Sequence, residues 1–332
     1  MTATCPWCSA PRDAGLVCPR CGADYAKAEA IKAHGRATPV VAVSEAAQRT
    51  QSRTDPALLI HAADADARQS VSDPLLEYRF CLAAIPLALC CAILFNASGL
   101  GASLQRIFLT MPVHEFGHAV SAWFCGYSAI PTLWKTIIPD TRGFIAPLAL
   151  GSAIGYLLYC GYRAQTKPLL VAGGSLLMLQ LVGTILFTPQ TAQTWIIFGG
   201  DGAGMILATL LMASFFFGKQ TQLYKGSLRW GFVVMGAAAF VDIYATWWKS
   251  RRDEGAMPYG TMDGMASDAM KLVETYGWTP QMLVSRYVTV GACCLVALTL
   301  VYAWGVWRAK AQLDAQKLAH KREGWAQRKT VM

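Results

Sequence analysis

Long apolar blocks separated by short charged loops are the feature that most constrains the fold of this chain. Hydrophobic residues make up 54% of its 332 residues and charged residues only 15%, whereas soluble domains carry roughly 25% charged residues. The hydrocarbon core of a bilayer is crossed by roughly 20 apolar helical residues. Because lipid cannot satisfy backbone polar groups, such blocks predict helices. We therefore expect an all-α polytopic membrane protein.

Seven apolar segments are long enough to be candidates for crossing the bilayer, so about 6–7 transmembrane helices are expected between residues 78 and 308. Tyr and Trp lie near the ends of several segments, as is typical of residues at a membrane interface. The candidate segments are 80–98, 104–126, 144–162, 168–188, 194–217, 229–248 and 287–307.

The net charge of +9 is carried mainly by loops and tails beside the apolar segments. Loops rich in Lys and Arg tend to lie on the cytosolic side of a membrane. We therefore interpret the charge as a topology signal and expect no nucleic-acid partner. The basic tail 309–332 and the N-terminus are both expected in the cytosol. Two ends on one side require an even number of spans. Pro147, Gly151 and Gly155 favour 144–162 as the segment that does not cross.

Two Cys-x-x-Cys pairs lie near the N-terminus: Cys5 with Cys8, and Cys18 with Cys21. Four thiolates at this spacing suit a tetrahedral structural zinc ion. A redox pair would sit in a βαβ pattern, which the surrounding sequence lacks, and disulfides would need an oxidising compartment. Residues 1–26 are therefore predicted to form a cytosolic zinc ribbon that binds Zn²⁺ and serves as a fold unit or contacts a cytosolic protein. They resemble the short zinc ribbons of many prokaryotic proteins.

The segment after the predicted ribbon, 27–77, is rich in Ala, Ser, Thr, Gln, Asp and Arg and poor in large apolar residues. Such a composition is typical of a flexible linker. The predicted organisation is thus a ribbon (1–26), a linker (27–77), a membrane domain (78–308) and a basic tail (309–332). We expect an integral protein of a prokaryotic cytoplasmic membrane, in contact with the lipid bilayer.

The segment 104–126 contains a His-Glu-x-x-His motif formed by His114, Glu115 and His118. Residues four apart share one helix face, so both imidazoles can bind one zinc ion, and Glu115 can take a proton from the attacking water. Glu115 is the only Glu between Glu77 and Glu254, and a carboxylate in an apolar segment is costly without a partner. A structural histidine pair is the alternative, but an ionisable group in a membrane segment favours a functional site.

A catalytic zinc ion needs a third protein ligand and an open coordination position. The apolar segments contain no further His, which leaves Asp as the ligand type. Asp201 lies among four glycines within 199–204, and we expect the helix to be loosened there around a cavity. Asp201 is therefore the predicted third ligand. Asp242, late in the segment 229–248, is the second candidate.

Two stretches of the chain resemble the motifs of the site-2 protease family, which are intramembrane zinc metalloproteases. The first is His-Glu-Phe-Gly-His-Ala at 114–119, and the second is Asp-Gly at 201–202 followed by Gly-Met-Ile-Leu at 204–207. The resemblance covers about residues 104–218. The family usually shows Asn-Pro or Leu-Pro before Asp-Gly, whereas this chain has Ile-Ile-Phe-Gly-Gly at 196–200.

This resemblance implies a zinc metallopeptidase that cleaves a peptide bond of another membrane protein, in or near its transmembrane segment. His114, His118 and Asp201 would hold the catalytic Zn²⁺, and Glu115 would be the general base and acid.

Two other functions are compatible with the same residues. The first is an inactive, protease-like scaffold that binds clients through its ribbon and helices, and the second is a transporter whose His and Asp side chains carry ions. A scaffold has no need of Glu115. A transporter commonly shows an internal repeat, and none is evident here. A zinc endopeptidase is therefore the expected function.

Overall fold

The computed structural model describes residues 74–217, 227–262 and 264–330, together with 11, 17, 18, 21 and 25. The chain divides into two units, Met1–Ser70 and Val71–Met332, and the second contains the predicted membrane domain. Cys5, Cys8 and most of the linker lie outside the described residues. The zinc ribbon, its Zn²⁺ and the linker therefore remain predictions.

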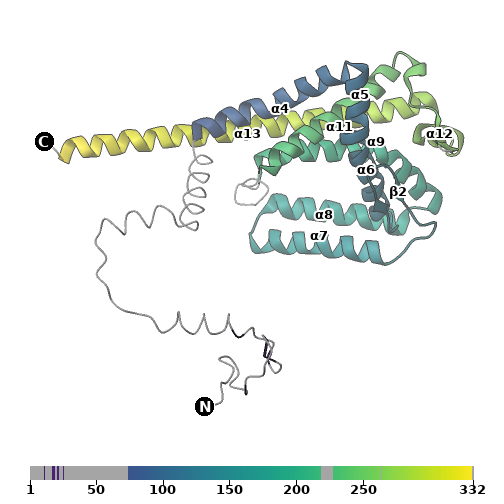
Figure 1. Cartoon of the computed structure of the whole chain (residues 1–332), viewed down its shortest axis with the longest axis horizontal. Coiled ribbons are helices and arrows are strands. Elements are labelled where there is room, and N and C mark those ends of the chain that lie inside the picture. The colour runs from purple at the N-terminus through teal and green to yellow at the C-terminus, as the bar shows by residue number, and fades with distance from the viewer. Residues whose placement is uncertain are drawn as a thin grey trace. The chain divides into compact units, whose positions relative to one another are not determined.

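The second unit is built almost entirely from helices (Figure 1). Its main helices are α4 (Pro74–Asn96), α5 (Gly99–Gln105), α6 (Met111–Phe124), α7 (Ile145–Arg163), α8 (Lys167–Leu181), α9 (Pro189–Ala213), α11 (Leu228–Ser250), α12 (Asp268–Glu274) and α13 (Pro280–Thr330). Short helical turns are η1 (Arg106–Thr110), η2 (Val182–Leu186), η3 (Ser214–Phe216) and η4 (Glu254–Ala256). Two antiparallel strand pairs complete it: β1 (Ile130–Pro131) with β2 (Thr136–Ile137), and β3 (Thr261–Met262) with β4 (Met265–Ala266).

Among the described residues, six helices are long and apolar enough to cross a membrane. This finding confirms the expected all-α polytopic architecture and six of the seven predicted segments. The six helices are Pro74–Asn96, Ile145–Arg163, Lys167–Leu186, Pro189–Phe216, Leu228–Ser250 and Pro280–Ala319.

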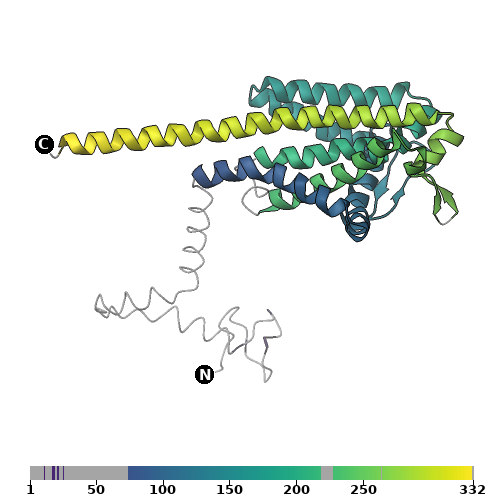
Figure 2. The same cartoon turned by 90° about the horizontal axis from the view of Figure 1, so that it is seen from above.

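The set of candidate spans differs from the one expected from the sequence. The segment 144–162, expected not to cross, is α7 and counts among the six candidate spans. The motif segment 104–126 is not among the six; it lies in α5, the π-helical turn η1 and α6, which follow one another without a break from Gly99 to Phe124. Figure 1 shows α5 and α6 running across the direction of α7, α8 and α13, and Figure 2 shows α5 nearly end-on.

The physical reason lies in the surroundings of this segment. The side-chain amide of Gln105 is buried and donates to the backbone oxygen of Ala238 at 3.0 Å, so it bonds to a neighbouring helix instead of facing lipid. An extra residue in the π-helical turn η1 also interrupts the regular helix. Apolar composition alone cannot distinguish a segment buried within the protein from one that faces lipid.

The beginning of α4 and the end of α13 lie at the same end of the helix bundle (Figures 1 and 2). This arrangement agrees with an even number of spans. The helix α6, the β1–β2 hairpin and α12 gather toward the opposite end.

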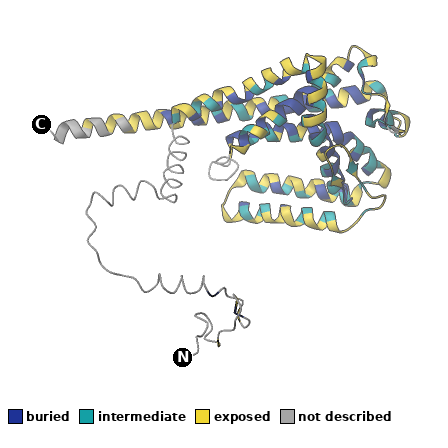
Figure 3. Ribbon diagram, viewed as in Figure 1, coloured by how far each residue is buried: buried dark blue, intermediate teal, exposed yellow. Residues whose placement is uncertain are grey.

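Burial identifies α9 as the central helix. Within the most apolar window of α9, 67% of the residues are buried, compared with 11% in α7 and 17% in α8. Figure 3 shows the same contrast, with α7 and α8 exposed along most of their length. Exposed apolar side chains on two long helices are expected where a protein faces lipid. The face of α9 that is covered by α6 and α11 is therefore where buried polar groups can meet one another.

Candidate metal centre

Helix α6 carries the three polar residues of the motif, and all three side chains are largely buried. The exposed fraction is 8% for His114, 6% for Glu115 and 8% for His118. Pro112 lies in the first turn of α6, directly after the π-helical turn η1. Because the two histidines are four residues apart, their imidazoles lie on one face of α6, with ring centroids 4.7 Å apart.

Glycines on both helices allow α6 to approach α9 closely. A Cβ atom on Gly117 would lie 2.5 Å from the backbone oxygen of Gly199 and 2.7 Å from that of Gly200. A Cβ atom on Gly200 would lie 2.5 Å from Nε2 of His118. The expected loosening of the helix around Asp201 is not present, because α9 is continuous from Pro189 to Ala213. The glycines instead remove side-chain volume between two packed helices.

The inner ring nitrogen of each histidine has a fixed partner. Nδ1 of His118 lies 2.8 Å from the backbone oxygen of Ile196, which can only accept, so Nδ1 carries the hydrogen. Nδ1 of His114 lies 2.8 Å from Oδ1 of Asp201, and a carboxylate favours the same tautomer. In the neutral imidazoles, both Nε2 atoms are left with a free lone pair.

These two lone pairs converge with a carboxylate oxygen from α12. The Nε2 atoms of His114 and His118 are 3.1 Å apart, and Oδ2 of Asp268 lies 3.2 Å and 3.0 Å from them, respectively. A tetrahedral zinc ion with bonds of about 2.0–2.1 Å holds its ligand atoms roughly 3.3 Å apart. Three electron-pair donors at this spacing repel one another unless a cation lies between them. His114, His118 and Asp268 thus form a group that could hold a metal ion.

Helix α12 positions Asp268 at its first residue. The hydroxyl of Ser267 caps the helix by accepting from the backbone N–H of Met270, and the buried Ala269 and Leu272 anchor it to the bundle. In a metal-free site, a proton on an imidazole would take the place of the cation. Burial raises the pKa of Asp268, but hydrogen bonds with His114 and His118 outweigh that effect and hold the pKa below its ordinary value.

The structure places Asp201 behind His114 instead of beside the converging Nε2 atoms. One carboxylate oxygen contacts Nδ1 of His114, and the other accepts from the indole N–H of Trp247 at 2.7 Å. Asp201 therefore holds the ring of His114, as an outer partner of a metal ligand does. The second candidate, Asp242, accepts from the guanidinium of Arg106 at 3.1 Å. Neither aspartate belongs to the possible ligand group found among the described residues.

Sequence reasoning missed Asp268 because it looked for the third ligand within the apolar segments. Asp268 lies in the polar connection between α11 and α13, 150 residues from His118. The only local signal is Ser267-Asp268, followed by an apolar pattern that buries Ala269 and Leu272, and this signal predicts a short capped helix rather than a ligand.

Glu115 and the two histidines have different hydrogen-bond partners. The hydroxyl oxygen of Thr136, on β2, lies 2.8 Å from Oε2 of Glu115 and 2.7 Å from its backbone oxygen. Glu115 is not a member of the possible ligand group. Glu115 is thus a buried carboxylate next to His114 that is not itself a possible ligand. Such a carboxylate is suited to accepting and donating protons.

The contact between α9 and the imidazoles yields a first prediction. A Gly200→Ala substitution places Cβ 2.5 Å from Nε2 of His118 and 2.6 Å from Cε1 of His114, so the imidazoles must shift or the two helices must separate. We expect zinc affinity to fall by about tenfold or more, together with a lower Tm. Metal analysis and thermal unfolding of the purified protein measure both.

The matched control is Gly155→Ala, since a Cβ atom at Gly155 on α7 meets nothing within 4 Å. Equal zinc affinity in the two variants would contradict the close packing of Gly200 against the imidazoles.

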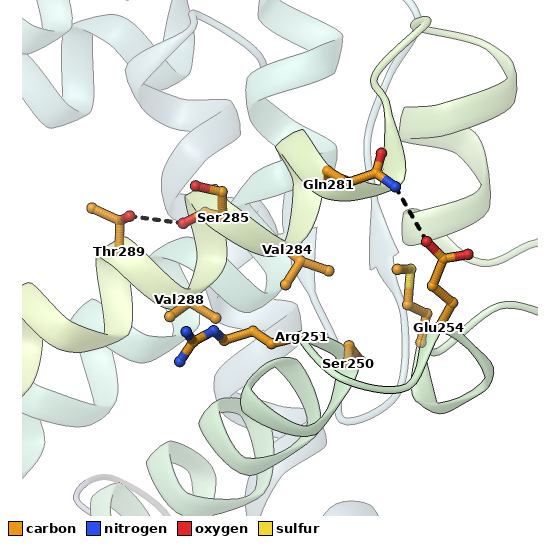
Figure 4. Close-up of a pocket in the computed structure, with 9 residues that line it drawn as sticks. Ser250, Arg251, Glu254, Gln281, Val284, Ser285, Val288 and Thr289 are labelled. Carbon is orange, nitrogen blue, oxygen red and sulfur yellow. Dashed lines mark hydrogen bonds between the residues drawn. The ribbon is translucent and has the colours of Figure 1, made fainter.

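A separate cavity of about 450 Å³ lies between the end of α11 and the start of α13 (Figure 4). It contains Arg251 on one side and Glu254 on the other, and the amide of Gln281 donates to Glu254 at 3.2 Å. Its lining residues include none of the three possible metal ligands. The cavity is therefore a feature distinct from the candidate metal centre.

Comparisons with models of protein families, with curated proteins and with solved structures found no match.

Proposed function

We propose that this protein is a membrane-embedded zinc endopeptidase that cleaves a peptide bond of another membrane protein, in or near its transmembrane segment. One observation carries the proposal. The free lone pairs of His114 and His118 converge with the Asp268 carboxylate, next to a buried Glu115 that is not part of the group. Two imidazoles and one carboxylate form a ligand set typical of catalytic zinc, which would keep a further position for water or substrate.

The residues around this group support a bound metal. Both histidines direct Nδ1 to an acceptor, one to Asp201 and the other to the backbone oxygen of Ile196. Metal-binding histidines are commonly held in this way. Trp247 in turn donates to Asp201 and fixes its carboxylate. When bound, zinc supplies a Lewis acid that polarises the peptide carbonyl and makes water a nucleophile near neutral pH.

Glu115 performs the proton transfers in the proposed reaction. It takes a proton from the attacking water and later delivers that proton to the leaving amine. Its side chain is only 6% exposed, so little bulk water is available to replace it as a base. His114 and His118 keep their Nδ1 hydrogens throughout, since both are bonded to fixed acceptors.

The membrane setting restricts the substrate. Peptide groups within a transmembrane helix are bonded to one another and shielded by side chains, so a helix must be locally opened before water can attack its carbonyl. The candidate site is built from α6 and α12, toward the end of the bundle opposite the end of α13. A peptide bond near the end of a span, where helical bonds are weakest, is therefore the expected substrate.

The proposal is tested with purified full-length protein that is co-reconstituted with a single-span reporter. The reporter carries glycines near one end of its span, and a matched reporter has leucines there. We expect cleavage of the first reporter only, loss of cleavage after the metal is chelated, and recovery when zinc is returned. Cleavage that persists in metal-free protein, or zinc-loaded protein that cuts no reporter, would refute the endopeptidase.

A further inference from the structure

The hydroxyl of Thr136 makes two contacts with one residue. Its oxygen lies 2.8 Å from the carboxylate oxygen Oε2 of Glu115 and 2.7 Å from the backbone oxygen of the same residue. Thr136 belongs to β2, which pairs with β1 in the hairpin directly after α6. The chain thus returns to its own motif helix, and a hydroxyl from the hairpin reaches Glu115.

A threonine hydroxyl has one hydrogen to donate and lone pairs with which to accept. When Glu115 is ionised, the hydroxyl can donate to Oε2. When Glu115 is protonated, the carboxyl group can donate to the hydroxyl, whose hydrogen then turns to the backbone oxygen of Glu115. The same two short distances accommodate both protonation states. Rotation of one hydrogen is the only change required.

We propose that Thr136 is the positioning residue for Glu115, a role that rests on the endopeptidase function proposed above. A glutamate side chain has several rotatable bonds, and ordering it costs conformational entropy. A hydrogen bond to an ionised carboxylate is among the stronger ones. Thr136 holds Glu115 in one orientation while it takes a proton and while it gives the proton up.

Three variants separate this role from a general effect of the hairpin. Thr136→Val keeps the shape and removes the hydroxyl, while Thr136→Ser keeps the hydroxyl. Thr132→Val removes a hydroxyl that bonds only within the hairpin turn, to the backbone oxygen and N–H of Lys135. In the reporter assay, we expect Thr136→Val to lower kcat by roughly 10- to 100-fold with KM nearly unchanged. Thr136→Ser and Thr132→Val should stay within about threefold of wild type.

A spectroscopic measurement tests the contact without any cleavage. In full-length protein labelled with ¹³C on glutamate carboxyl groups, the infrared band lost in Glu115→Gln identifies Glu115. Thr136→Val should shift that band, and Thr136→Ser should leave it in place. If Thr136→Val does not fold, Thr136→Ala provides the same comparison.

A wild-type kcat in Thr136→Val, an equal loss in Thr132→Val, or an unshifted Glu115 band would each overturn the role of Thr136. If the wild-type protein cuts no reporter, the proposed function and the positioning role both fail. A band shift in that case would show that the contact with Glu115 exists without the function, so the two failures are distinguishable.

Discussion

Replacing Glu115 with Gln should leave a folded protein that binds zinc and has lost cleavage. The amide keeps the size of the carboxylate and can still contact the hydroxyl of Thr136, but it cannot take a proton from water. Loss of a general base typically slows a reaction by about 10²- to 10⁴-fold. The buried setting of Glu115 places the expected loss at the upper end, since bulk water has poor access. Cleavage rates of the co-reconstituted reporter, measured at equal zinc content, provide the check.

The control for this experiment is Glu254→Gln, because Glu254 is exposed, lines the separate cavity and contacts Gln281 there. It should cleave as fast as the wild type. Undiminished cleavage by Glu115→Gln would remove the proposed base. A cellular phenotype that survives the same substitution would favour an inactive scaffold that binds clients through its ribbon and helices.

Replacing Asp268 with Ala should weaken zinc binding more than any other aspartate substitution in the membrane unit. Asp268 supplies the oxygen that forms a triangle with the two Nε2 atoms, at 3.0 Å from His118 and 3.2 Å from His114. Asp201→Ala removes an outer partner of His114, and such losses cost about 10- to 100-fold in metal affinity. The Asp268→Ala loss should exceed that range. Chelator competition on the purified variants measures both.

Asp242→Ala is the matched control, because Asp242 pairs with Arg106 and not with either histidine. Its zinc affinity should stay close to that of the wild type. If Asp201→Ala loses zinc more severely than Asp268→Ala, then Asp201 is the ligand that the site-2 protease resemblance implies. The carboxylate would then have to turn from Nδ1 of His114 toward the metal.

The predicted ribbon can be tested separately from the membrane site. Cys18 and Cys21 are among the described residues, and Cys18 is buried. Double replacement of Cys18 and Cys21 by Ser should remove one zinc equivalent per chain and leave the membrane site filled. The reason is that a structural site loses its metal when half of its thiolates are removed. Unchanged metal content would contradict the ribbon.

Sequence alone determined the properties that depend on local pattern. Lipid offers no partners for backbone groups, so long apolar blocks had to form helices, and six of them are long and apolar enough to span. Helical periodicity placed His114 and His118 on one face and Glu115 beside them. These features follow from residues within a few turns of one another, and the structure agrees with them.

Tertiary structure decided the rest, because it depends on contacts between distant segments. The sequence did not show that the motif segment runs across the bundle, because its direction depends on contacts with distant helices, such as the one between Gln105 and the backbone oxygen of Ala238. The four-residue spacing of Gly200 and Gly204 allows a neighbouring helix to approach closely, but only the packing decides that α6 is that helix. Asp268 reaches the histidines from a polar connection 150 residues away, and only the packing of α12 against α9 brings the three side chains together.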